Sequence, residues 1–150
     1  MIMPPILVDT NVLLYFYDPN TYTKQERAQL VLDNLYQLGI GRLSTQNLSE
    51  FVNSAMRRLD PPLTADQVYE QAALLASSWT ILDLTPQIVL EAVRGVRDHG
   101  LSFYDAQIWA AARLNQVPVI FSEDFQDGQI LEGVRFVNPF SAQFDLADWI

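Results

Sequence analysis

Cysteine is absent from this 150-residue chain, and histidine occurs once, as His99. The missing thiols exclude a disulfide framework and any thiolate-bound zinc or iron–sulfur site. A single histidine excludes a metal site built on several imidazoles. A metal bound by this chain must therefore use oxygen ligands, which favours hard cations such as magnesium or manganese.

Basic residues are also scarce. Nine Lys and Arg side chains face 18 Asp and Glu side chains, which gives a net charge of −9, and Lys24 is the sole lysine. This balance argues against a protein that holds nucleic acid by general electrostatic attraction. It leaves open an enzyme that meets nucleic acid through bound metal and a few placed arginines.

Long apolar runs are missing as well. The sequence has no 18-residue apolar stretch and no basic segment followed by an apolar leader, so we expect neither a signal peptide nor a membrane span. A cytoplasmic location is the default expectation. Hydrophobic residues nevertheless make up 49% of the chain, including three Trp, six Tyr and eight Phe. This content predicts one compact domain over residues 1–150.

Short apolar segments alternate with helical patterns along the chain. The segments "PPILV", "IGRLS", "WTILDL", "VPVIF" and "VRFV" are typical of strands, at residues 4–8, 40–44, 79–84, 117–121 and 134–137. Helical spacing, caps and stops predict helices over 25–38, 48–59, 64–78, 86–99 and 102–114. This alternation predicts an α/β fold with a mostly parallel sheet covered on both faces.

Two acids directly follow predicted strands. Asp9 ends "PPILV", and Asp124 lies just past "VPVIF". The carboxyl ends of parallel strands meet at one edge of a sheet, so the two carboxylates can share one rim, where sites of such folds collect. The alternative is that each acid only begins a turn or caps a helix, as Asp often does.

Asp105 has two interpretations from its position in "LSFYD". With Ser102 as N-cap, Asp105 takes the third helical position, which is a capping-box arrangement with Asp in place of Glu. A carboxylate in the first turn of a helix is also kept ionised by the helix dipole and could take a metal. The two interpretations are compatible.

Glu50 carries little signal of its own. In "TQNLSEFVNSAMRRL" it points almost opposite the apolar stripe that includes Phe51 and Ala55, so periodicity indicates a solvated surface acid. Arg57 and Arg58 in the same segment are interpreted as helix-face residues, with RNA contact as the less favoured alternative.

Four segments together resemble one family. In order along the chain, "ILVDTNVLLYFY", "NLSEFVN", "SFYDAQIWAAA" and "VIFSEDFQDGQ…GVRFVNPF" are similar to the PIN-domain ribonucleases, and most of all to the VapC-like toxins of type II toxin–antitoxin pairs. The resemblance covers essentially the whole chain. It implies a three-layer α/β/α sandwich with a small, mostly parallel sheet and a metal-dependent site that hydrolyses RNA phosphodiesters.

The resemblance also implies which acids form the site. By position, Asp9, Glu50, Asp105 and Asp124 match the family's catalytic acids, with Asp9, Asp105 and Asp124 expected to contact metal directly or through water. Glu50 is expected either to bind metal or to orient the attacking water. Four carboxylates at close range raise one another's pKa, so such a cluster is costly unless cations neutralise it.

Three further residues fall in the matching segments. Asn11 and Ser122 match polar positions that support the site, and Asp127 falls where the family varies and is expected to be peripheral. The cofactor implied is Mg²⁺, with Mn²⁺ as the alternative. The implied partners are an RNA substrate, a cognate antitoxin that occupies the acidic cleft with an Arg or Lys, and a second copy of the chain in a homodimer.

Other functional classes fit less well. A receiver-like signalling module needs adjacent acids near its first strand and a lysine after a later strand, but "VDTN" has one acid and Lys24 lies early in the chain. A haloacid-dehalogenase-like phosphatase needs a second acid two residues after the first, where this chain has Asn11. A PIN-like fold used only for interaction remains the third alternative.

Overall fold

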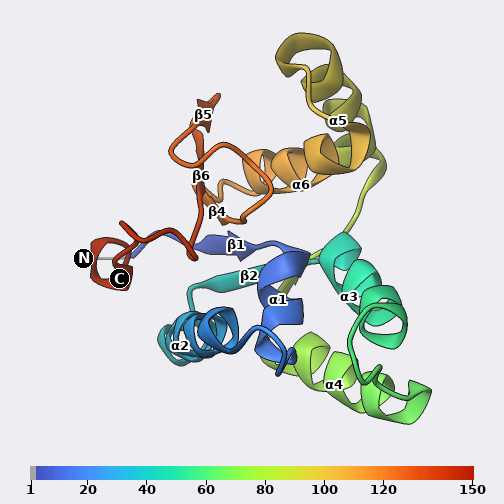
Figure 1. Ribbon diagram of the computed structural model, residues 1–150. Helices are drawn as coiled ribbons and strands as arrows, with labels where there is room; N and C mark the ends of the chain where they lie inside the picture. The colour runs from blue at the N-terminus through green and yellow to red at the C-terminus, as the bar shows by residue number, and fades with distance from the viewer. Residues whose placement is uncertain (1–2) are drawn as a thin grey trace.

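The computed structural model describes residues 3–150, so Met1 and Ile2 of the expected 1–150 domain lie outside the described residues. Six strands form one sheet in the order β3-β2-β1-β4-β6-β5 (Figure 1). Every neighbouring pair is parallel except β5 and β6, which are antiparallel. The strands are β1 (Ile6–Val8), β2 (Gly41–Ser44), β3 (Thr80–Leu82), β4 (Val119–Phe121), β5 (Ile130–Leu131) and β6 (Val134–Val137).

The helices begin and end where the sequence places capping residues. Thr64 and Gln67 form a capping box, Thr85 caps a helix that begins with Pro86, and Gly100 ends that helix in the left-handed conformation. The helices are α1 (Thr10–Phe16), α2 (Tyr22–Leu38), α3 (Thr45–Arg57), α4 (Ala65–Ser78), α5 (Pro86–His99), α6 (Phe103–Leu114) and a 3-10 turn, η1 (Leu146–Asp148). None of these helices is long and apolar enough to cross a membrane.

The sheet separates two hydrophobic cores. In β1 the side chains of Ile6 and Val8 pack into the core that α1, α2, α3 and α4 cover, whereas Leu7 packs into the core covered by α5 and α6 (Figure 1). Successive side chains of a strand point to opposite faces of the sheet. All three residues are fully buried because helices cover both faces. The mostly parallel α/β/α sandwich expected from the sequence is therefore confirmed.

The structure adds three elements that the sequence patterns did not predict. Helix α1 follows β1 after a single residue, β5 contains two residues, and η1 contains three. Elements this short hold too few residues to show a period of 2 or 3.6. The predicted strand over 79–84 is also shorter in the structure, because only Thr80–Leu82 pair with β2.

The arrangement of strands brings three chain segments to one edge of the sheet. Strand β1 lies between β2 and β4 and is parallel to both, with Val8 opposite Phe121. The segments that leave β1, β2 and β4 therefore emerge side by side at the carboxyl ends of the strands. Crevices at such positions are where open α/β sheets bind ligands.

Candidate active site

Asp9 is the most deeply buried acid at this edge of the sheet. Asp9 directly follows β1, is the N-cap residue of α1, and is 3% exposed. Its Oδ1 accepts hydrogen bonds from the Thr10 backbone N–H at 2.7 Å and from Asn47 Nδ2 at 3.2 Å. Its Oδ2 accepts one from Ser122 Oγ at 2.7 Å. Three segments thus fix both oxygens of one carboxylate.

Burial changes the protonation of this carboxylate. The pKa of Asp9 is raised from 3.8 to about 7, chiefly by loss of solvent on burial. The nearby charges of Asp124 and Glu50 contribute to this rise, whereas the bonds from Ser122 and Thr10 oppose it. Near neutral pH, the charged and neutral forms are therefore close in free energy. A bound cation would favour the charged form, because it would place a positive charge next to the carboxylate.

The four acids that the resemblance assigned to the site line one pocket. Asp9 reaches it from the end of β1, Glu50 from α3, Asp105 from the first turn of α6, and Asp124 from the segment after β4. The pocket has a volume of about 130 Å³. It is small, polar and walled by elements from both layers of helices, which suits an ion and part of a phosphate better than a large apolar ligand.

Glu50 differs from what periodicity alone indicated. The interpretation as a solvated acid is wrong, because the polar face of α3 packs against the site: Asn47 is fully buried and Ser54 is 8% exposed. Glu50 itself is half-buried, and its carboxylate accepts hydrogen bonds from Gln46 Nε2 at 2.6 Å and Thr10 Oγ1 at 3.4 Å. The face of α3 that reads as polar is thus the wall of the pocket.

The predicted capping box at the start of α6 does not form. Ser102 is the N-cap, but its side chain makes no capping hydrogen bond. Asp105 instead lines the acidic pocket while keeping its place in the first turn of α6. The N-terminal end of the helix dipole favours negative charge at this position, and the side chain lies where a ligand in the pocket can reach it.

Ser122 and Asn11 form hydrogen bonds beside the acids of the pocket. Besides donating to Asp9, Ser122 Oγ accepts hydrogen bonds from the Asp124 backbone N–H at 3.1 Å and Asn11 Nδ2 at 3.3 Å. The Asn11 side chain lines the pocket, and its Oδ1 is buried without a hydrogen-bond partner among residues 3–150. Asp127 lies away from the pocket lining, where its Oδ1 accepts from the Asn138 backbone N–H at 2.9 Å.

Sequence reasoning missed several residues that hold these groups in place. Asn47, which bonds Asp9, also forms a capping box with Ser44 at the start of α3, and their spacing of three residues could have revealed it. Glu123 accepts hydrogen bonds from Tyr15 and, at 2.8 Å, from Lys24, which ties the segment carrying Asp124 to α1 and α2. No sequence signal links these three distant residues.

The donor set fits a hard cation. The pocket offers carboxylate oxygens and the unpartnered amide oxygen of Asn11, and hard cations prefer such ligands. Within residues 3–150, no three acidic or histidine side chains converge on one ion-sized position. The acids line one pocket without converging on a single point. Magnesium usually retains several waters and binds one or two carboxylates, so it does not need such convergence.

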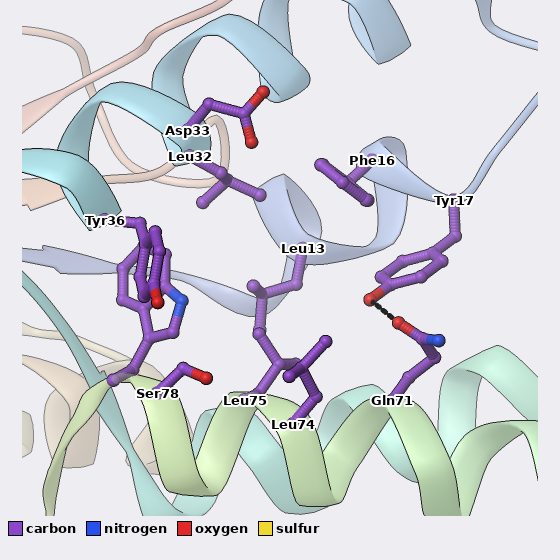
Figure 2. Close-up of a pocket in the computed structure, with 11 residues that line it drawn as sticks. Leu13, Phe16, Tyr17, Leu32, Asp33, Tyr36, Gln71, Leu74, Leu75 and Ser78 are labelled. Carbon is purple, nitrogen blue, oxygen red and sulfur yellow. Dashed lines mark hydrogen bonds between the residues drawn. The ribbon is translucent and has the colours of Figure 1, made fainter.

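A second hollow lies away from the acids, between α1, α2 and α4 (Figure 2). Leu13, Leu32 and Leu75 point into it, and Tyr17 donates a hydrogen bond to Gln71 at 2.8 Å across one end. Its volume is about 250 Å³, and Asp33 is the single ionisable carboxylate among the described lining residues. The hollow offers apolar contact rather than catalytic chemistry.

Comparison with known protein families identifies the fold. The family model described as "PIN domain" matches residues 6–126, which include all four pocket acids and both supporting residues. The chain belongs to the PIN domain family. No curated protein sequence matches this PIN domain significantly.

Solved structures share its architecture. A toxin–antitoxin complex from Klebsiella pneumoniae matches at TM-score 0.67 with 20% identity, over 89% of this chain and 97% of that one. VapC20 of Mycobacterium tuberculosis, a sarcin-ricin loop cleaving toxin, matches at 0.63 with 19% identity, over 85% and 97%. VapBC-1 of nontypeable Haemophilus influenzae matches at 0.63 with 17% identity, over 91% and 98%.

The raised pKa of Asp9 predicts how stability depends on pH without metal. Between about pH 4 and 7 the unfolded state has lost this proton while the native state retains it, so the free energy of unfolding falls as pH rises through this window. Asp9→Asn removes this contribution. In chelator, the free energy of unfolding of the variant should therefore rise by about 2–4 kcal/mol relative to that of wild type as the pH is raised from 4 to 7.5.

The measurement is urea unfolding of both proteins at several pH values in chelator. Comparing the two proteins cancels the titration of the other acids. A stability difference that stays constant with pH would contradict the burial argument.

Proposed function

We propose that this PIN domain is a metal-dependent endoribonuclease that hydrolyses RNA phosphodiesters, and that it is the toxin of a type II toxin–antitoxin pair. The observation that carries the proposal is the placement of Asp9, Glu50, Asp105 and Asp124 around one small pocket at the carboxyl ends of the strands. The PIN domain match and the likeness to toxin folds support it.

Each pocket acid has a role in this proposal. Asp9, Asp105 and Asp124 would hold one or two Mg²⁺ or Mn²⁺ ions directly or through water. Such an ion supplies Lewis acidity at the scissile phosphate and lowers the pKa of the attacking water. Glu50, whose carboxylate is held by Gln46 and Thr10, orients that water toward phosphorus. Ser122 and Asn47 keep the Asp9 carboxylate aimed into the pocket.

The direct test is cleavage of total cellular RNA with Mg²⁺ or Mn²⁺. Wild type should give discrete products that disappear in chelator. Asp9→Asn and Asp124→Asn should each lower the cleavage rate by about 100-fold or more, because each loses a charge that holds the cation.

Asp127→Asn is the matched control in the same segment as Asp124. Its amide oxygen can still accept the hydrogen bond from Asn138, so its cleavage rate should equal that of wild type. Equal cleavage by wild type and Asp9→Asn would mean that the activity belongs to a contaminant or another site.

Arg58 provides the positive charge that an acidic nuclease needs beside its pocket. It lies just past α3, and it is the one cationic side chain among the described residues that line the acidic pocket. Its guanidinium makes no hydrogen bond or ion pair with the described part of the chain, residues 3–150. We assign Arg58 to an RNA phosphate next to the scissile one.

Arg58→Gln should raise the KM for RNA and lower the slope of log affinity against log salt by about 1, since one phosphate contact is lost. Arg57→Gln is the control, because Arg57 lies one residue away but not in the pocket lining. Measuring RNA affinity over a range of salt concentrations separates the two. An identical salt slope for both variants would mean that Arg58 does not contact an RNA phosphate.

The cognate antitoxin is proposed to cover the acidic pocket. The structures from Klebsiella pneumoniae and Haemophilus influenzae are of toxin–antitoxin complexes, and the net charge of −9 favours a basic partner segment. An Arg or Lys of the antitoxin would neutralise the acids in place of the cation.

This arrangement predicts competition between antitoxin and metal. In a Mn²⁺ titration followed by calorimetry, one equivalent of cognate antitoxin should weaken metal binding by about tenfold or more, because both ligands neutralise the same carboxylates. Metal binding that is undisturbed by saturating antitoxin would place the antitoxin elsewhere.

A further inference from the structure

A second cavity adjoins the acidic pocket. It has a volume of about 440 Å³, and it shares Gln46, Glu50 and Tyr104 with the acidic pocket as a common wall. The two spaces are therefore next to each other. We call this second space the base cavity. A ligand group bound in the base cavity would lie next to the group that occupies the acidic pocket.

Tyr104 presents an aromatic ring at this wall. Its residue is 67% exposed although its neighbour Asp105 lines the acidic pocket. The Tyr104 backbone carbonyl accepts a hydrogen bond from Gln46 Nε2 at 3.1 Å, and its ring meets Phe103 edge to face at 5.3 Å between centroids. The backbone is thus held in place while the ring remains free to stack on a planar ligand.

The rest of the lining combines apolar surface with a few polar groups. Leu84, at 45% exposure, adds apolar area, and Ser49 adds a hydroxyl. Gln107 donates its amide nitrogen to Gln46 at 2.8 Å, so its amide oxygen is left as an acceptor with no hydrogen-bond partner in the described residues 3–150. A planar ring with polar edges matches this combination, because its faces stack while its edges form hydrogen bonds.

The charge of the base cavity excludes a phosphate there. None of the described residues lining it is cationic, and Glu50 places a carboxylate on its wall. A phosphate would be repelled, whereas a neutral nucleobase would not. The phosphate-binding charge, Arg58, lines the acidic pocket instead.

We propose that the base cavity is the subsite for one unpaired nucleobase of the RNA, next to the scissile phosphate, with the base stacked on Tyr104. This assignment rests on the proposed ribonuclease function. It makes cleavage depend on a base at one side of the cut and favours single-stranded over paired RNA, since a paired base cannot enter the cavity.

The test combines a protein variant with a substrate variant. The substrate is a single-stranded oligoribonucleotide that wild type cleaves, with the base on each side of the cut removed in turn. For wild type, removal at one side should lower kcat/KM by about 5- to 100-fold. The Tyr104→Leu variant should cleave the intact substrate more slowly than wild type does, by a similar factor. Its kcat/KM for the abasic substrate should then equal its own kcat/KM for the intact substrate. Equal abasic losses in wild type and Tyr104→Leu would overturn the subsite.

Two further variants separate stacking from general effects. Tyr104→Phe keeps the ring and should retain most of the wild-type rate. Tyr69→Leu changes another exposed tyrosine, on α4, which is 78% exposed and outside both cavities, and should behave as wild type toward both substrates. A Tyr104→Phe variant as slow as Tyr104→Leu would mean that stacking is not the role of this residue.

A binding measurement keeps this inference separate from the ribonuclease proposal. Fluorescence anisotropy with the labelled oligoribonucleotide in Ca²⁺, which binds carboxylates without the tight octahedral geometry of Mg²⁺, reports RNA affinity in the absence of turnover. If wild type cleaves no RNA, the nuclease proposal fails, yet Tyr104→Leu must still bind the oligonucleotide about 5- to 100-fold more weakly than Tyr69→Leu. Equal affinities would overturn the base cavity.

Discussion

The Asp9 carboxylate lies at 3% exposure where three segments of the chain meet, and it takes one hydrogen-bond donor from each. Thr10 belongs to α1, Asn47 to α3, and Ser122 follows β4. Burial without a counter-charge raises its pKa to about 7, so the fold holds this group at a cost in free energy. Such a cost is typical of a ligand-binding site, where a cation or substrate restores the balance.

The strand-end acids could be predicted from the sequence because topology places them. Strands β1 and β4 pair in parallel with Val8 opposite Phe121, so Asp9, one residue later, and Asp124, three residues later, reach the same edge. Buried apolar strands and capped helices can be recognised in the sequence, and their order predicts this arrangement. The same logic predicted the α/β/α layers, since β-branched runs that alternate with helices require cover on both faces of the sheet.

Glu50 and its neighbours could not be found in this way. Periodicity separates polar from apolar faces, but it does not say whether a polar face meets water or another polar group. Asn47 and Gln46 lie on the polar side of α3, yet both are buried. Asn47 bonds Asp9, and Gln46 bonds Glu50 and Gln107. Resemblance to the family located Glu50, and only the packed structure showed Arg58 and Tyr104 beside it.

Binding of Mn²⁺ at neutral pH measures whether the acidic pocket holds a hard cation through Asp9. Calorimetry of wild type, Asp9→Asn and Asp127→Asn needs no knowledge of the RNA substrate. We expect saturable binding by wild type and Asp127→Asn, and binding about tenfold or more weaker in Asp9→Asn. No binding by wild type, or equal binding by Asp9→Asn, would contradict this expectation.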